Sequence, residues 1–387
     1  MFPKKNIAHF VESFPVTGQD YIYNQILNNA DTGAIFITER LIQNRNTFNL
    51  APFYYKRYSR CSFLNRLSSK LNDGLFNRIH LQKFNSYAQK ILEENKVSLM
   101  HAHFGSMGYK LIGLRKKLDI PLVVTFYGVD VSYCLKSRLW LTRFRPMFES
   151  ADRLIVLCEE AKDRLIGLGC EPEKICIWNI GMDLEGFPYR ERQCRGQGPG
   201  FLTAARFVEK KGYPILLKAF SILAEKRKDI HLTALGYGPL KGRIQKMIAD
   251  SGLGSMVTLI DTEKIEDFNQ FYRQLLPQHD IFVLPSVIAR DGDDEGGPAL
   301  SLVYAQAAGL PVVATPFAGA SRSIIDNKTG LFVESGNTRD LADKMQYLID
   351  NPDIWNNLGR AGSDLVKNEF SLHKQLKVLE DIYASLV

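Results

Sequence analysis

Residues 293–315 read Asp293-Asp-Glu-Gly-Gly-Pro-Ala-Leu-Ser-Leu-Val-Tyr-Ala-Gln-Ala-Ala-Gly-Leu-Pro-Val-Val-Ala-Thr315. This order predicts an acidic loop, a glycine turn, a helix and a strand. Gly297 can cap the helix, and Pro298 suits its first turn, where a missing N–H costs nothing. Gly309 ends the helix, and the apolar residues 311–315 are typical of a buried parallel strand. A loop, helix and strand in this order predict an α/β fold.

The predicted start of this helix is suited to binding a diphosphate. The first N–H groups of a helix lack partners within the helix, and the helix dipole is positive there. Gly296 and Gly297 let a ligand approach the backbone closely. Glu295 lies just outside the helix, where a carboxylate does not suit a phosphate. We therefore predict that Glu295 binds a sugar hydroxyl.

The composition is that of a soluble globular protein. The chain has 387 residues, with 45% hydrophobic and 24% charged residues, which leaves room for two domains of ordinary size. Its apolar runs are shorter than a bilayer span, and the apolar part of residues 1–10 is too short for a signal peptide. We expect a cytoplasmic protein. Six cysteines without a Cys-x-x-Cys pair argue against a zinc site or a disulfide framework.

Strand and helix patterns alternate along the chain, which predicts parallel sheets with helices on both faces. The predicted strands are 6–10, 34–38, 98–104, 121–126, 153–158, 174–179, 200–204, 231–235, 257–260, 280–284, 311–315 and 330–333. The polar segment 190–199 is interpreted as a linker. We therefore expect two doubly wound Rossmann-like domains, 1–189 and 200–368. Residues 369–387 form a last helix that could cross back to the first domain. Ligands of such sheets bind beyond the carboxyl ends of the strands, so a central cleft between the domains is expected.

Several short motifs occur in order along both halves of the chain. They are Phe14-Pro-Val-Thr-Gly-Gln-Asp-Tyr-Ile22, His101-Ala-His-Phe-Gly105, Thr125-Phe-Tyr-Gly-Val-Asp130, Asp183-Leu-Glu-Gly-Phe187, Ala205-Arg-Phe-Val-Glu-Lys-Lys-Gly212, Leu235-Gly-Tyr-Gly-Pro239, Asp280-Ile-Phe-Val-Leu-Pro-Ser286 and Glu295-Gly-Gly-Pro298. The set resembles glycosyltransferase family four, the retaining enzymes of the GT-B fold. The motifs of the front half are similar to those of enzymes that build bacterial exopolysaccharides of the colanic-acid type.

This resemblance implies roles for residues of the second half. Arg206 and Lys211, which follow a predicted strand, would clamp the diphosphate and stabilise the departing nucleotide diphosphate. Glu295 would bind the transferred sugar. The expected donor-binding residues are Gly18, Arg206, Lys211, Gly236, Glu295, Gly296, Gly297, Pro298, Ala299, Leu300 and Gln306. The expected catalytic residues are Glu295, Arg206, Lys211, Tyr127 and Asp130.

The chain departs from the family pattern at two positions. Val303 stands where the family has a second glutamate, which holds the ribose diol. Gln306 lies three residues further, on the same predicted helical face, and is the expected substitute. Tyr127 stands where relatives usually have a histidine before the glycine. Tyr127 and His103 are the expected acceptor-side residues, with Asp130 nearby.

Two groups of residues could suggest a metal. His101 and His103 alternate at a strand end, so they lie on one side of the sheet, and Asp130 could join them. Residues 291–294 read Asp-Gly-Asp-Asp, but no glutamate follows at the spacing of a calcium loop, which favours a solvated loop. The resemblance implies a metal-independent enzyme, and we expect no cofactor.

The net charge of +7 is concentrated in part between Tyr54 and Phe84. Basic and aromatic residues alternate there, as in proteins that sit on anionic lipid. A solvated helical face explains the same pattern. A nucleic-acid partner is not expected, because no nucleic-acid-binding motif accompanies the basic residues.

The preferred hypothesis is a retaining glycosyltransferase. It would move a hexose from a nucleotide diphosphate sugar to a glycan or lipid-linked oligosaccharide, in the cytoplasm or on the inner face of the membrane. The alternatives are a nucleotide-sugar epimerase of the GT-B fold and a non-catalytic homologue that partners an active enzyme. The sequence does not favour a dinucleotide dehydrogenase, because no Gly-x-Gly-x-x-Gly follows the first strand.

Overall fold

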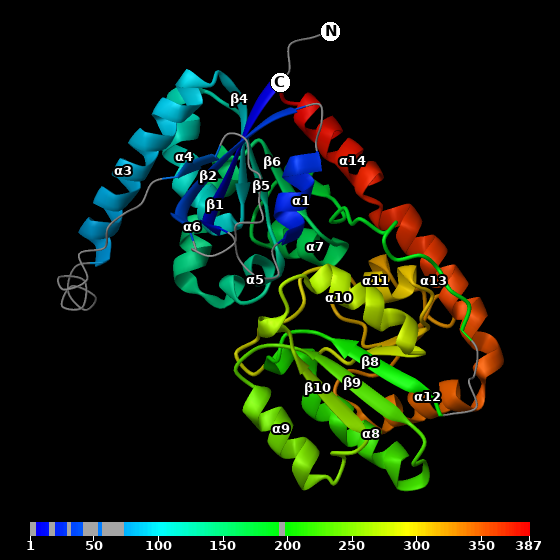
Figure 1. The fold of residues 1–387 in the computed structure, drawn as a ribbon. Coiled ribbons are helices and arrows are strands. Elements are labelled where there is room, and N and C mark those ends of the chain that lie inside the picture. The colour runs from blue at the N-terminus through cyan, green and yellow to red at the C-terminus, as the bar shows by residue number, and fades with distance from the viewer. Residues whose placement is uncertain (1–4, 15–19, 29–31, 42–52, 56–72, 193–197) are drawn as a thin grey trace. The chain divides into compact units, whose positions relative to one another are not determined.

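The computed structural model describes residues 5–14, 20–28, 32–41, 53–55, 73–192 and 198–387. The chain divides into two compact units, each built on its own parallel sheet. Unit 1 contains residues 1–156, 162–181 and 375–387, and unit 2 contains residues 157–161 and 182–374. The last residues of the chain thus group with unit 1, although they follow unit 2 in sequence (Figure 1).

Unit 1 holds a seven-stranded sheet in the order β3-β2-β1-β4-β5-β6-β7. The strands are β1 (Lys5–Phe14), β2 (Thr32–Leu41), β3 (Phe53–Tyr55), β4 (Val97–His103), β5 (Leu122–Thr125), β6 (Arg153–Val156) and β7 (Ile175–Ile177). All neighbours pair in parallel, with His9 of β1 opposite His101 of β4 and His103 of β4 opposite Thr125 of β5. The strand order reverses between β1 and β4, and such a switch point is where open α/β sheets bind ligands.

The helices of unit 1 cover this sheet. They are α1 (Asp20–Asn28), α3 (Asp73–Glu94), α4 (Gly105–Leu118), α5 (Gly128–Val131) and α6 (Arg138–Ser150), and α7 (Glu159–Gly167) and α14 (Leu372–Ala384) lie mostly in this unit. Helix α4 packs against both α3 and α6. The strands β4, β5 and β6 are almost entirely buried and most of their residues are apolar, as expected for strands covered on both faces.

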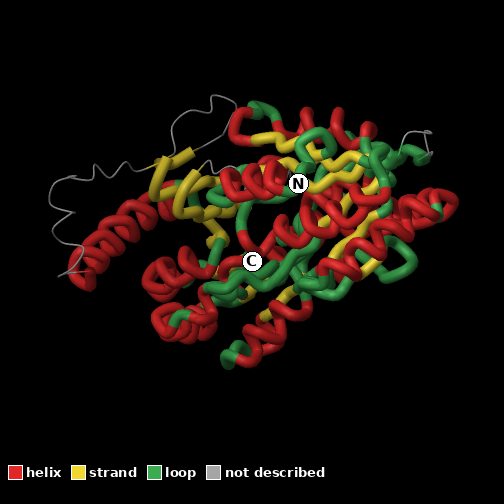
Figure 2. The backbone as a smooth tube through the Cα atoms, turned by 90° about the horizontal axis from the view of Figure 1, so that it is seen from below, coloured by secondary structure: helices red, strands yellow, loops and turns green. Residues whose placement is uncertain are grey.

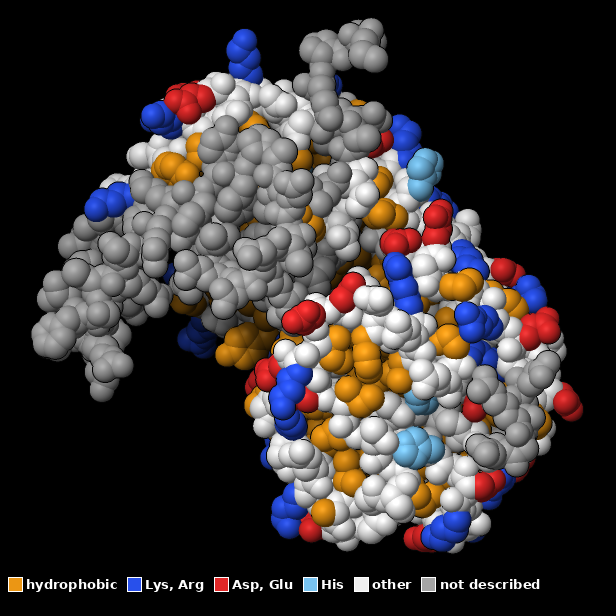
Figure 3. All heavy atoms as spheres, viewed as in Figure 1, with side chains coloured by type: hydrophobic (Ala, Val, Ile, Leu, Met, Phe, Trp, Pro, Cys, Tyr) orange, Lys and Arg blue, Asp and Glu red, His pale blue; other side chains and the backbone are white. Residues whose placement is uncertain are grey.

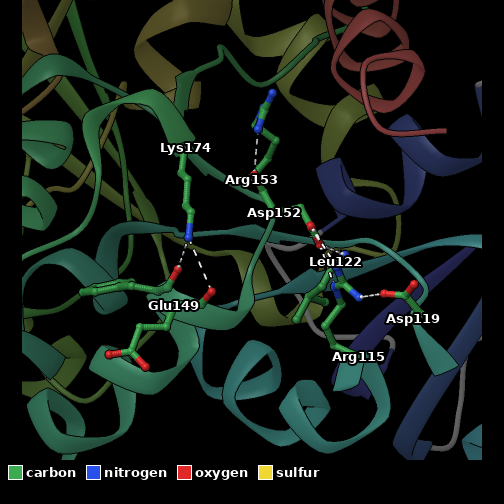
Figure 4. Close-up of polar contacts among 8 residues, drawn as sticks. Arg115, Asp119, Leu122, Glu149, Asp152, Arg153 and Lys174 are labelled. Carbon is green, nitrogen blue, oxygen red and sulfur yellow. Dashed lines mark hydrogen bonds and ion pairs between the residues drawn. The ribbon is translucent and has the colours of Figure 1, made fainter. Parts of the chain in front are cut away.

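Asp152 stabilises the amino edge of the unit 1 sheet (Figure 4). Its carboxylate accepts two hydrogen bonds from the Arg115 guanidinium, at 2.8 and 3.1 Å, and one from the backbone N–H of Leu122, at 2.8 Å. Arg115 also donates to Asp119 at 2.8 Å. The end of α4 and the starts of β5 and β6 are thus tied together at the edge opposite the strand ends that face ligands.

Unit 2 holds a six-stranded parallel sheet in the order β10-β9-β8-β11-β12-β13. The strands are β8 (Gly200–Ala204), β9 (His231–Gly236), β10 (Val257–Asp261), β11 (Ile281–Leu284), β12 (Val312–Ala314) and β13 (Leu331–Phe332). The helices are α8 (Tyr213–Lys226), α9 (Lys241–Asp250), α10 (Phe268–Leu275), α11 (Leu300–Ala307), α12 (Thr338–Asp350) and α13 (Trp355–Phe370). Helices lie on both sides of the strands (Figure 2). The switch point here lies between β8 and β11.

The core of unit 2 is formed by aromatic and branched side chains. Phe201, Phe220, Ile281 and Trp355 belong to a buried cluster that joins the sheet to α8, α12 and the start of α13. The Trp355 indole also donates to the carbonyl of Leu348 at 2.8 Å, so its polar atom is satisfied inside the core. This packing holds the loops after β8 and β11 on a rigid base.

The twelve strands expected from sequence are confirmed to within a few residues, and β3 is the strand that the sequence did not reveal. The first residues of the predicted linker pack on unit 2. Arg192 is buried and donates to the carbonyls of His279 and Ala308, at 2.9 and 2.7 Å. The chain at this point is therefore part of unit 2.

None of the helices that the structure describes is long and apolar enough to cross a membrane.

Candidate active site

The loops after β8 and β11 bring charged residues together at the switch point of unit 2. Lys210 and Lys211 lie on a single 3-10 turn, Glu209–Lys211, that follows β8. Ser286 and Glu295 follow β11. Gly212 ends the 3-10 turn with φ 67°, and a Cβ there would collide with the carbonyl of Pro285. Only glycine lets the β8 loop run this close to the β11 loop.

Glu295 is buried and held from two sides. The Lys211 ammonium lies 2.5 Å from its Oε1, and the Ser286 hydroxyl donates to the same oxygen at 2.9 Å. Burial alone would raise the pKa of Glu295, but the positive charges of Lys211 and Lys210 and these two hydrogen bonds hold the pKa below its ordinary value. Glu295 is therefore a carboxylate at neutral pH, able to accept hydrogen bonds from sugar hydroxyls.

The aspartates before Glu295 shape the loop. Lys210 is buried and forms an ion pair with Asp293 at 3.0 Å, and it also donates to the carbonyl of Asp294 at 2.7 Å. Asp291 accepts from the backbone N–H of Asp293 at 3.0 Å, which closes a tight turn. Asp293 is thus a structural partner of Lys210. The sequence analysis did not single out Lys210.

Arg206 differs from its two lysine neighbours because its side chain is exposed. Within the part of the chain that the structure describes, its guanidinium has no hydrogen-bond or ion-pair partner. Lys211 is half-buried and uses one of its three N–H donors on Glu295. Both cations predicted from sequence therefore keep donors for an anionic ligand.

Two glycines lie in close contact with the backbone of the loops that form this site. A Cβ at Gly236, the last residue of β9, would collide with the carbonyl of Ala205. Gly319 has φ 84°, and a Cβ there would lie 2.6 Å from the carbonyl carbon of Gly297. These glycines are needed for packing, and the donor-binding role of Gly236 stays a prediction.

Helix α11 begins later than the sequence predicted. It runs from Leu300 to Ala307, and Ala299, not Gly297, occupies the N-cap position without a capping side chain. Pro298 therefore lies in the loop, so the first helical N–H groups belong to Leu300 and Ser301. The Ser301 hydroxyl donates to the carbonyl of Ala204 at 2.5 Å and fixes α11 to the end of β8. The predicted end of the helix is confirmed by Gly309, whose φ is 87°.

The structure places Gln306 in the core of unit 2, and its expected role in ribose binding stays a prediction. Gln306 is fully buried, and its amide donates to the carbonyls of Ser323 and Thr329, at 2.8 and 3.3 Å. Val303 is also fully buried, so the helical face that these two residues share is turned into the protein.

Tyr304 is the residue of this helix that the sequence analysis missed. It is half-buried, while Val303 and Gln306 on either side are inaccessible. Its ring packs on Phe187 with centroids 4.2 Å apart. The Arg273 guanidinium lies over the same Phe187 ring, 5.1 Å from its centroid. Tyr304 is therefore a second candidate for hydrogen bonding to a ligand on α11. Its position next to Val303 was the available signal.

Unit 1 carries a different group of polar residues at its own switch point. His101 and His103 lie on one side of β4, as predicted, with their rings 4.3 Å apart. His9 of β1 joins them, with Nδ1 of His9 3.2 Å from Nε2 of His103. His103 then contacts the Tyr127 hydroxyl at 3.0 Å, and His101 contacts the Tyr383 hydroxyl of α14 at 2.6 Å. The sequence analysis missed His9 and Tyr383, because strand register and a returning helix bring them to this place.

These histidines are neutral at physiological pH. All three are buried, and burial lowers the pKa of His9 from 6.5 to about 3. Burial, with repulsion from neighbouring histidines, also lowers the pKa values of His101 and His103 well below the ordinary value. Burial raises the pKa of Tyr127 well above its ordinary value, so the hydroxyl stays protonated.

Asp130 does not join the histidines. One of its carboxylate oxygens accepts from the backbone N–H of Gly105 at 3.1 Å, and the other accepts from that of Tyr127 at 3.0 Å. Burial raises the pKa of Asp130 to about 7, although these hydrogen bonds act to lower it. Asp130 therefore fixes the loops after β4 and β5. Phe104, which connects β4 to α4, has φ 75°, a strained value for a residue with a side chain.

A metal site in unit 1 would consist of His9, His101 and His103, which each have one possible ligand atom within 4.8 Å of the others. It would not use Asp130. The rings already have protein partners, since His101 also contacts the Thr125 hydroxyl at 2.7 Å. A neutral hydrogen-bonded network accounts for the same geometry.

Two predictions lie outside the described residues. Gly18 falls in the undescribed segment 15–19, and most of the basic and aromatic stretch from Tyr54 to Phe84 falls in 56–72.

Comparison with known proteins identifies the class. A profile described as "Glycosyltransferase Family 4" matches residues 51–185, and one described as "Glycosyl transferases group 1" matches residues 190–364. Together they cover most of both units, and the protein is a glycosyltransferase with family 4 and group 1 domains.

Two of the similar curated proteins are named for exopolysaccharide biosynthesis. The amylovoran biosynthesis glycosyltransferase AmsK of Erwinia amylovora is 27% identical, over 98% of this chain and 99% of its own length. The putative colanic acid biosynthesis glycosyltransferase WcaL of Escherichia coli is 25% identical over 88% of this chain and 89% of its own. Among solved structures, Anabaena HepE in complex with UDP aligns with a TM-score of 0.75 at 14% identity, covering 99% of this chain and all of that one. This likeness establishes the GT-B fold.

Proposed function

We propose that the protein is a retaining glycosyltransferase of bacterial exopolysaccharide synthesis. It transfers a hexose from a nucleotide diphosphate sugar to a hydroxyl of a glycan, carried on a lipid. The observation that carries this proposal is the set of Lys211, Glu295 and Ser286 at the switch point of unit 2, with the exposed Arg206 on the same loop after β8 as Lys211. The names of the related AmsK and WcaL support the exopolysaccharide assignment.

The charges of unit 2 suit a donor with an anionic half and a neutral half. The unpaired guanidinium of Arg206 and the remaining N–H donors of Lys211 would hold the diphosphate. The Glu295 carboxylate would accept hydrogen bonds from the sugar. Because Lys211 contacts Glu295 directly, the two halves of the donor would be held on either side of one ion pair, with the anomeric carbon near it.

Transfer would proceed by departure of the nucleotide diphosphate. The bond between the anomeric carbon and the phosphate oxygen breaks, and its electron pair leaves with the diphosphate, whose charge Arg206 and Lys211 stabilise. The acceptor oxygen bonds to the same face of the sugar and its proton passes to the departing phosphate. This route retains the anomeric configuration and requires no carboxylate nucleophile.

Unit 1 would bind the acceptor. Tyr127 is held by His103 and His9 as a protonated phenol, which can donate to or accept from a sugar hydroxyl. Neutral rings suit a neutral glycan, since no charge has to be desolvated when it binds. We propose that the enzyme works in the cytoplasm, at the inner face of the membrane, and needs no metal.

A two-step experiment tests this function. A thermal-shift panel of UDP, GDP and their sugars identifies the donor, because a ligand of the native state raises the melting temperature. Incubation of that donor with lipid-linked oligosaccharides, in buffer with EDTA, should then give an acceptor-dependent product with retained anomeric configuration by NMR. Conversion of the nucleotide sugar without an acceptor would indicate an epimerase. Binding of no nucleotide would refute the proposal.

A further inference from the structure

A surface formed by α5, the 3-10 turn Cys134–Lys136 and the start of α6 carries exposed apolar side chains. Val129 is 43% exposed, Tyr133 50% and Leu139 55%. Among the described residues, only three other large hydrophobic side chains are exposed this far, Ile288, Ile325 and Tyr347, and they lie in unit 2. The 3-10 turn packs against both α5 and α6, so the three residues belong to one surface, here called the α5–α6 surface.

The same surface is basic. Residues 131–148 contain four basic residues and no acidic residue. Lys136, Arg138 and Arg145 are exposed, and in the described parts of the chain none of them has an ion-pair partner. Figure 3 shows hydrophobic and basic side chains side by side along the lower edge of unit 1, where Figure 1 draws α5 and α6.

Helix α6 is amphipathic, with one face buried in unit 1 and the other exposed on the α5–α6 surface. Phe144, Met147 and Phe148 are buried against the unit, and Arg138, Leu139 and Arg145 face outward. Trp140 is half-buried beside them, and the Arg143 guanidinium lies 5.0 Å over its ring. The outward face of α6 thus carries aliphatic and cationic side chains, and the exposed Tyr133 adds an aromatic ring before it, which is the composition of surfaces that lie in a membrane interface.

We propose that the α5–α6 surface docks on an anionic phospholipid bilayer. The exposed Leu139, Val129 and Tyr133 would enter the headgroup region, while Lys136, Arg138 and Arg145 would pair with lipid phosphates. Exposed aliphatic side chains gain nothing from contact with a polar glycan. Unpaired cations gain nothing from a protein partner whose surface has few acidic residues. An anionic bilayer satisfies both sets of groups at once.

The position of the surface relates it to the acceptor side of unit 1. Helix α5 begins three residues after β5 ends, and Asp130 and Tyr127 lie on this same connection. Docking here would hold the carboxyl edge of the unit 1 sheet, with His103 and Tyr127, close to the lipid surface. This inference deepens the proposed function, since a lipid-linked acceptor presents its sugar at that height. The contact with lipid itself does not require catalysis.

The test is cosedimentation of the full chain with vesicles of phosphatidylcholine, either alone or with about one-third phosphatidylglycerol. We expect binding to the anionic vesicles, with strong loss at roughly 0.5 M salt, because the Debye length falls below about 5 Å. Tyr133→Asp/Leu139→Asp should weaken binding about tenfold or more. The matched control Tyr347→Asp/Ile325→Asp places the same changes on unit 2 and should bind as the wild type does.

A second pair of variants isolates the charges. Arg138→Glu/Arg145→Glu should lose anionic-vesicle binding, while Lys226→Glu/Lys246→Glu, exposed lysines of unit 2, should retain it. Equal binding to neutral and anionic vesicles, equal losses in test and control variants, or no binding by the wild type would overturn the proposal. Thermal shift by nucleotide in every variant checks the fold. A protein that binds vesicles but no nucleotide would refute the proposed function alone.

Discussion

Unit 1 and unit 2 place polar side chains at the same topological position, yet they use opposite chemistry. In unit 1 His9, His103 and Tyr127 form a buried chain of neutral rings. In unit 2 the half-buried Lys211 forms an ion pair with the buried Glu295, and the exposed Arg206 lies on the same loop as Lys211. Burial of neutral groups that satisfy each other is stable without a ligand charge, whereas the charges of unit 2 gain most from an ionic ligand. The difference suggests a neutral acceptor in unit 1 and an anionic donor in unit 2.

The largest effect is expected from breaking the ion pair of unit 2. Lys211→Met leaves the Glu295 carboxylate buried with only Ser286, and should lower the free energy of unfolding by about 3–5 kcal/mol as well as abolish transfer. Adding Glu295→Gln to Lys211→Met should restore much of the stability but none of the activity. Denaturant unfolding and a transfer assay measure the two effects. If Lys211→Met alone is as stable as the wild type, the pair does not hold the loops together.

Arg206→Ala should separate catalysis from stability. The guanidinium is exposed and unpaired in the described structure, so its removal should leave the melting temperature unchanged. Loss of a charge that stabilises the leaving group should raise the barrier to transfer by about 2–4 kcal/mol. Arg290→Ala is the matched control, because Arg290 is an exposed arginine of the same unit that pairs with Glu209 on the surface. Normal turnover of Arg206→Ala would remove Arg206 from the mechanism.

The neutral rings of unit 1 predict a pH dependence of stability. The folded-state pKa of His9 is depressed from 6.5 to about 3, so its contribution to stability is complete above pH 6.5 and is lost as the pH falls toward 3. The loss is roughly 1.4 kcal/mol per pH unit for each histidine that stays neutral in the fold. Asp130 acts in the opposite direction, because its folded-state pKa is raised to about 7.

Melting temperatures between about pH 7 and 5 measure this balance. We expect a fall on acidification that is smaller in His9→Phe and steeper in Asp130→Asn, because the asparagine variant lacks the opposing carboxyl group. A melting temperature of Asp130→Asn that does not change over this range would show that the histidines protonate in the folded protein, because the opposing carboxyl group is absent from this variant.

The smallest effect concerns α11. Tyr304→Phe should weaken binding of the nucleotide diphosphate by about 0.5–1.5 kcal/mol, the range for one hydrogen bond, without loss of stability. Gln306→Ala should do the reverse, since it removes the donor to Ser323 and Thr329 but touches no ligand. Calorimetry and thermal melts of both variants measure these effects. Weaker binding in Gln306→Ala at unchanged stability would return the ribose role to Gln306.

The sequence determined the secondary structure and much of unit 2. Buried parallel strands are continuous apolar runs between glycines and prolines, so their positions are local properties of the chain. Glu295, Arg206 and Lys211 stand in short motifs next to these strands. The two cations already indicate an anionic ligand, and the carboxylate indicates a sugar hydroxyl. His101 and His103 could be placed on one side of a strand because side chains alternate with period two.

Tertiary structure decided the partners of these residues. Strand register placed His9 opposite His101, and the return of α14 brought Tyr383 to the same ring cluster, across 282 residues of sequence. Packing of α11 turned Val303 and Gln306 inward and left Tyr304 accessible, which helical spacing alone could not distinguish because all three lie within one turn. The approach of the β8 and β11 loops joined Lys211 to Glu295. Contacts between segments distant in sequence depend on how whole elements pack, and no local pattern records that packing.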